Sequence, residues 1–245
     1  MRVLLVVWLT ALLQQGCVTE TTGGTDMEAN PQAALSRRVE LARQYVGRGD
    51  WENAKRNLEL AADIDANSAE VYEAFALVYQ STGEYELAEE SFERALRLDP
   101  SFSRARNNYA AFLYSLGRYA DAEPQFERVT KDTLYSARPL AFINLGLSWL
   151  RLNDSAGAEM AFSRALRMDR RNPIALLEMG FIKVRAGEIA AAEQYYGVYR
   201  TVVGRQPPRG LLLGIEIAAA KGDKNTVSSY ELALKNLYPN SAEYQ

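Results

Sequence analysis

The stretch that decides the fold is residues 69–102, AEVYEAFALVYQSTGEYELAEESFERALRLDPSF. Apolar and small residues recur in it at helical spacing on both sides of Gly83. Glycine readily adopts the left-handed conformation that ends a helix, and Pro100 stands where a second helix must stop. The stretch therefore predicts a helix, a tight turn at Gly83 and a second helix.

The spacing of small and aromatic residues indicates how the two helices pack. Ala76 and Ala88, eighth and twentieth in the stretch, let two backbones approach closely, and Phe92 fills the gap to a neighbouring unit. Eight positions match, in register, a repeat pattern of about 34 residues. They are Tyr72, Phe75, Ala76, Tyr79, Ala88, Phe92, Ala95 and Pro100. The stretch resembles a tetratricopeptide repeat.

The same pattern recurs along most of the chain. Repeats start at residues 35, 69, 103, 139, 173 and 207, and the last one is degenerate, as terminal repeats often are. The third step is two residues longer, which predicts a loop at 130–138. We expect an all-α fold: a right-handed superhelical solenoid of six tetratricopeptide repeats, about twelve helices, over residues 35–240, with a short tail at 241–245.

Composition narrows the possible functions. The 245 residues are 48% hydrophobic and 24% charged, with a net charge of −3 and scattered basic residues, which argues against nucleic acid as a partner. Histidine is absent and there is one cysteine, so imidazole sites and CxxC metal sites are excluded. No nucleotide-binding or hydrolase motif is present. We expect no enzyme activity, no small-molecule substrate and no cofactor.

The first residues read as an export signal. A positive start and an apolar run from Val3 to Leu13 lead to Cys17, the only cysteine. We expect residues 1–16 to be a lipoprotein signal peptide and Cys17 to carry diacylglycerol and an N-acyl chain, although Gln14 stands where leucine is usual. Ordinary cleavage beside a chance cysteine is the alternative. Residues 17–34 then form a polar, flexible tether, and Val18 favours the outer membrane, on its periplasmic side.

The inner face of the solenoid is the predicted binding surface, because such repeats use their concave side. Its expected positions are polar in repeats two and three and become apolar in repeats four to six. Either a partner covers this apolar half, for example with an amphipathic helix, or the superhelix fills its own groove. The candidate groove residues are Asn108, Tyr114, Leu140, Ile143, Asn144, Leu147, Leu150, Ile174, Leu177, Phe181, Val184, Leu211 and Ile215.

Asn108 and Asn144 occupy the same position in successive repeats. Their amides can donate to and accept from a ligand backbone, although local capping or solvation explains two asparagines equally well.

The whole chain is similar to the lipoproteins of type IV pilus biogenesis, the pilotin family that includes PilF, PilW and Tgl. Beyond the general repeat pattern, the similarity lies in residues 107–109, 112–114, 132–135, 144–147, 176, 178–179, 211–214, 237–239 and 243–244. The resemblance implies a noncatalytic outer-membrane factor that binds the pilus secretin and helps it to localise, multimerise or remain stable, supporting twitching motility. The alternatives are a scaffold lipoprotein of another envelope machine, or a regulator of a cell-wall enzyme.

Overall fold

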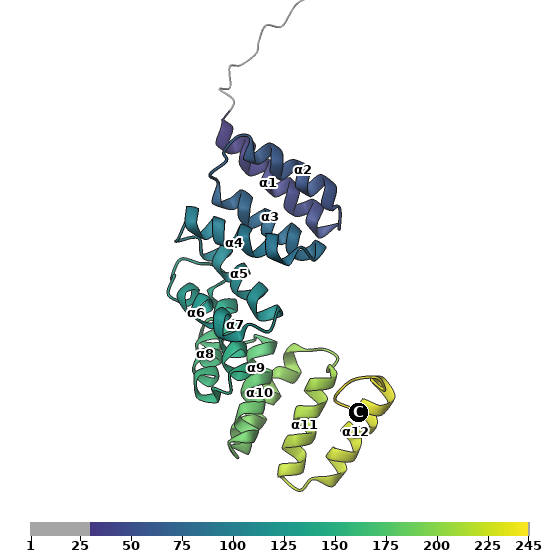
Figure 1. The fold of residues 1–245 in the computed structure, drawn as a ribbon. Helices are drawn as coiled ribbons and strands as arrows, with labels where there is room; N and C mark the ends of the chain where they lie inside the picture. The colour runs from purple at the N-terminus through teal and green to yellow at the C-terminus, as the bar shows by residue number, and fades with distance from the viewer. Residues whose placement is uncertain (1–29, 245) are drawn as a thin grey trace, which may run out of the picture.

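The computed structural model describes residues 30–244, so the predicted signal peptide, Cys17 and most of the tether lie outside the described residues. The described part consists of twelve α-helices and contains no β-strand, as the repeat pattern predicts (Figure 1). Each repeat contributes two helices. The pairs are α1 (Pro31–Gly47) and α2 (Trp51–Ala62), α3 (Ala69–Thr82) and α4 (Tyr85–Leu98), α5 (Ser103–Ser115) and α6 (Tyr119–Thr130), α7 (Arg138–Arg151) and α8 (Ser155–Met168), α9 (Pro173–Arg185) and α10 (Ile189–Val202), and α11 (Pro208–Ala220) and α12 (Lys224–Leu237).

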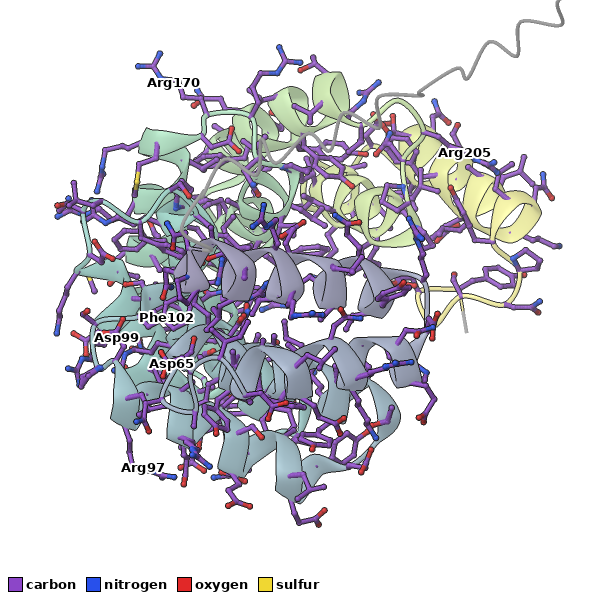
Figure 2. The ribbon with its side chains drawn as sticks, turned by 90° about the horizontal axis from the view of Figure 1, so that it is seen from above. Asp65, Arg97, Asp99, Phe102, Arg170 and Arg205 are labelled. Carbon is purple, nitrogen blue, oxygen red and sulfur yellow. The ribbon has the colours of Figure 1, made fainter. Side chains whose placement is uncertain are left out.

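The pairs stack in chain order into a curved solenoid, with α1 and α12 at opposite ends (Figure 1). First helices also contact first helices of the next repeat, as α1 does with α3 and α9 with α11. Turns between repeats gather on one edge in the N-terminal half, where Figure 2 labels Asp65, Asp99 and Phe102. None of the helices between residues 30 and 244 combines the length and hydropathy needed to cross a bilayer.

The turn within each repeat needs a left-handed residue. Gly83 has φ of 81°, which confirms its predicted role as the end of α3. In repeat four the same place is taken by Asn153, with φ of 63°, and asparagine tolerates this conformation better than other side chains.

The small and aromatic positions of the pattern form the core. Ala76 and Ala88 are fully buried, and the backbones of α3 and α4 approach there. The ring of Phe92 lies 5.6 Å from that of Tyr109 and 5.7 Å from that of Phe112, so it joins repeat two to repeat three. Aromatic packing therefore contributes to the contact between these two repeats.

The structure corrects one boundary and explains two irregularities. Helix α1 begins at Pro31, four residues before the expected start, because the side chain of Asn30 accepts a hydrogen bond from the N–H of Ala33 (3.1 Å). Residues 31–34 therefore belong to the first helix and not to a tether. Pro124 lies inside α6, and the two extra residues lengthen the connection between α6 and α7 into a loop.

Candidate interaction groove

Four predicted groove residues are buried in the core and do not line an open surface. Ile143, Leu177, Phe181 and Leu211 are each less than a tenth exposed. The reason is that the first helices of successive repeats pack against one another. Phe181 on α9, for example, belongs to one buried cluster with Leu213 and Ile217 of α11, and the guanidinium of Arg209 on α11 lies 5.1 Å from its ring centre. For these positions, the alternative that the solenoid fills its own groove is correct.

The other apolar candidates remain accessible, at least in part. Leu140 and Ile174, near the starts of α7 and α9, are each 44% exposed. The half-buried members of the same set are Tyr114, Leu147, Leu150, Val184 and Ile215. We call these seven side chains the apolar strip. Its members lie on the first helices of repeats three to six, so these apolar side chains remain partly exposed after the solenoid has packed.

A small apolar cavity lies at the N-terminal end of the strip. It has a volume of about 60 Å³ and is lined by Ala111, Tyr114, Phe126, Asn144 and Leu147. Tyr114 packs edge-on against Tyr119, at 4.9 Å between ring centres. The Asn144 amide therefore lies beside an apolar recess, which is the arrangement that a peptide backbone next to an inserted side chain requires.

The polar half of the inner face is an internal network. The Glu73 carboxylate on α3 is fully buried. It accepts a hydrogen bond from Asn108 (Nδ2 to Oε1, 2.6 Å), pairs with Arg43 on α1, and lies 3.8 Å from the guanidinium of Arg104. Asn108 is therefore engaged within the fold, unlike its counterpart Asn144, which lines the cavity. The network ties together the first helices of repeats one, two and three.

A second buried carboxylate joins repeats five and six. Glu178 on α9 accepts a hydrogen bond from Arg209 on α11, at 2.8 Å. Burial raises the pKa of the Glu178 carboxyl above its ordinary value, and the Arg209 charge opposes part of that rise. Both networks place opposite charges on adjacent first helices. The repeat pattern predicts which residues lie on the inner face. Which of their charges form ion pairs depends on the relative orientation of neighbouring repeats, which the pattern does not give.

Within residues 30–244, no three His, Cys, Asp or Glu side chains gather as metal ligands would. The apolar strip offers hydrophobic contact, one recess and one amide. Such a surface recognises an apolar or amphipathic segment of another chain.

Comparison with known proteins agrees with this architecture. The tetratricopeptide repeat family model matches residues 73–139. The type IV pilus assembly protein PilF of Pseudomonas aeruginosa is 38% identical over 241 residues, which cover 98% of this chain and 95% of PilF. A solved structure from the functional characterization of that PilF has a TM-score of 0.82 and 39% identity, covering 88% of this chain and 96% of the other.

PilW, described as a widely conserved type IV pilus biogenesis factor, has a TM-score of 0.74 and 29% identity to this chain. The match covers 86% of this chain and 96% of PilW. The similarity to PilF extends over nearly the full length of both proteins, well beyond the part that the general repeat model matches. The chain therefore belongs to the family of the type IV pilus assembly protein PilF, as a tetratricopeptide-repeat protein of type IV pilus biogenesis.

Proposed function

We propose that the chain is an outer-membrane pilotin: a lipoprotein that faces the periplasm, binds a segment of the type IV pilus secretin, and promotes its localisation and multimerisation. The observation that carries the proposal is the partly open apolar strip of a chain that belongs to the PilF family. Under this proposal the protein is not an enzyme, and its partners are a protein segment and a membrane.

The apolar strip would hold a secretin segment by hydrophobic burial. Each square ångström of apolar surface removed from water contributes about 25 cal/mol. Leu140 and Ile174 would bury the most apolar surface on binding, because nearly half of each side chain is exposed. One aliphatic side chain of the segment would enter the cavity beside Tyr114 and Leu147, and the Asn144 amide would bond to its backbone. A membrane-active secretin segment would thus stay covered by the strip until it packs against neighbouring secretin protomers.

The lipid on Cys17 is the second part of the proposal. Acylation contributes about 0.8 kcal/mol for each buried CH₂ group, so several chains on one cysteine hold a protein firmly on a bilayer. Cys17→Ala should release the protein from the membrane fraction without altering its helical circular dichroism, because Cys17 lies outside the described fold. Normal fractionation of this variant would contradict the anchor.

The secretin role is tested by deleting the gene and blotting envelopes for multimers that resist detergent and heat. We expect multimers to disappear while secretin monomer remains, and the wild-type gene to restore them. Leu140→Asp and Leu147→Asp should fail to restore them, because a charge within the strip opposes apolar contact.

Met160→Asp is the matched control, since Met160 is 64% exposed on α8, outside the strip. Unchanged multimers after deletion would refute the proposed role. Multimers at the wild-type level with both strip variants would show that the secretin-binding surface lies elsewhere on the solenoid.

A further inference from the structure

The loop between α6 and α7 presents one leucine to solvent. Leu134 is 93% exposed, more than any other large apolar side chain between residues 30 and 244. The loop contains the two residues by which this repeat exceeds the 34-residue period. Leu134 is not one of the seven side chains of the apolar strip.

The loop backbone is held in place, so the exposure of Leu134 follows from a fixed conformation. Asp132 is the centre of the turn. One carboxylate oxygen accepts a hydrogen bond from the hydroxyl of Ser103 at the start of α5 (2.5 Å), and the other accepts from the N–H of Leu134 (3.0 Å). Arg138 donates from Nε to the carbonyl of Thr130 (2.7 Å), which closes the loop at its base. The fold therefore aims an apolar side chain outward.

A basic pocket of about 670 Å³ opens beside this leucine. It is lined by Pro100, Ser101, Ser103, Arg106, Arg128, Lys131, Asp132 and Leu134. Three of these residues are cations, and Asp132 is the one carboxylate among them. The pocket lies at the turn between repeats where Figure 2 labels Phe102.

Two of the three cations have no carboxylate to neutralise them. Arg106 donates to Gln125 (2.7 Å) and to the carbonyl of Pro100 (2.8 Å), both uncharged groups. Burial, with the nearby positive charge of Arg128, lowers the pKa of the Arg106 guanidinium. Within residues 30–244 neither arginine forms an ion pair, whereas Lys131 pairs with Glu127 at 3.1 Å. The pocket therefore has a positive potential that suits an anion.

We propose that this pocket binds the phosphate of an anionic phospholipid headgroup while Leu134 inserts among the acyl chains. The combination of one outward apolar side chain and unneutralised cations matches the interfacial region of a bilayer, where phosphate lies directly above hydrocarbon. A positively charged cleft alone would fit many anions. The adjacent, fully exposed leucine distinguishes a lipid from a soluble phosphate.

The position of the loop agrees with a membrane as the partner. The start of α1 and the turns between repeats lie on the same edge of the N-terminal half of the solenoid (Figure 1). Asn30 follows Cys17 by 13 residues, which can span at most about 45 Å when fully extended. A lipid on Cys17 would therefore keep this edge close to the bilayer. The inference uses the lipid anchor of the proposed function and is independent of the secretin.

The test is vesicle co-sedimentation of the chain from residue 17 onward carrying Cys17→Ser, so that neither acylation nor the apolar run from Val3 to Leu13 masks the loop. Vesicles of phosphatidylcholine, with and without phosphatidylglycerol, are the probes. We expect binding that needs phosphatidylglycerol and weakens with added salt, because exposed charges are screened. Leu134→Ser should weaken it at least about tenfold. The variant Arg128→Gln should weaken it about fivefold, the loss expected for one cation near the membrane surface.

Matched controls separate the loop from general effects of charge and apolarity. Arg164→Gln removes one charge at the equivalent position of the next repeat, and Leu152→Ser removes a leucine that is 40% exposed at the turn within repeat four. Both controls should bind vesicles as the parent chain does. Inorganic phosphate should compete poorly, because it makes no contact with Leu134.

Three results would overturn the inference. The first is equal vesicle binding by the parent chain and both loop variants. The second is a charge variant that loses vesicle binding while Leu134→Ser binds as the parent chain does, which would indicate a site for soluble anions. The third is no vesicle binding by the parent chain. Loss of secretin multimers in cells that carry Leu134→Ser would then make the loop a protein contact. Secretin multimers that survive Leu134→Ser leave the proposed function intact whatever the vesicles show.

Discussion

Substitution of Gly146 by alanine tests the close approach of helices on which the repeat architecture depends. Gly146 lies within α7, where a Cβ atom would come within 2.8 Å of the ring of Phe162 on α8. Ordinary contacts of a Cβ atom lie between 3.4 and 4 Å. The ring cannot move aside easily, because Phe162 is fully buried among Ile143, Ala158 and Met179. The two helices must therefore separate, or the ring must take a strained position.

The magnitude follows from two opposing effects. Overpacking a core with one extra methyl group costs about 1–3 kcal/mol. Replacing glycine by alanine inside a helix contributes about 1 kcal/mol of stability. Gly197→Ala isolates the second effect, because Gly197 lies within α10 and a Cβ atom there would meet no other atom within 4 Å. The difference in unfolding free energy between the two variants should therefore be about 2 kcal/mol.

The assay is urea denaturation followed by circular dichroism, with the unfolding slope compared among the three proteins. Gly146→Ala should unfold at lower urea than the parent chain, and Gly197→Ala at higher urea. For a chain of this size each kcal/mol corresponds to about 2–4 °C in melting temperature. Equal stabilisation of both variants would refute the reasoning, because Phe162 would then not press on the backbone of α7.

Three further predictions concern buried side chains. Glu73→Ala should lower the unfolding free energy by about 3 kcal/mol in urea titrations, because it leaves Arg43 without its buried partner; a loss below about 0.5 kcal/mol, typical of surface changes, would contradict the network. Burial raises the pKa of the Glu178 carboxyl in the folded state above the ordinary value of 4.5 that it has in the unfolded chain. Its ionisation therefore lowers the unfolding free energy as the pH rises past 4.5. Glu178→Gln, which does not ionise, should gain stability relative to the parent as the pH rises through that window, and a pH-independent difference would exclude this effect. Phe181→Asp should unfold the C-terminal repeats, seen as lost helical circular dichroism, whereas Leu147→Asp should keep its helices; a folded Phe181→Asp would show that this ring is not part of the core.

Much of the fold could be predicted because each repeat contains residues that determine its own local structure. Gly83, Ala88 and Phe92 specify a turn, a close contact and an aromatic filler, and the same positions recur along the chain. The repeat pattern predicts the first repeat only from residue 35, whereas α1 begins at Pro31, because proline is favourable at the first helical position when Asn30 caps the helix.

The site was predictable only in outline. A template of repeat positions assigns Phe181 and Leu147 alike to the inner face, yet one is buried and the other is half-exposed. The difference arises from the next repeat, since α11 places Arg209 against the Phe181 ring. Likewise, Asn108 and Asn144 occupy the same position, but a glutamate in the preceding repeat engages only the first. Such contacts depend on pairs of residues in different repeats, which a single repeat pattern does not contain.

The central claim, that the apolar strip holds a secretin segment, is tested most directly by photo-crosslinking in living cells. A photoreactive amino acid placed at Leu147 should yield an adduct that a secretin antibody recognises, because Leu147 lines the cavity proposed to receive the segment. The same amino acid at Met160, exposed on α8, should yield none. A secretin adduct of equal strength from both positions, or from neither, would contradict the account.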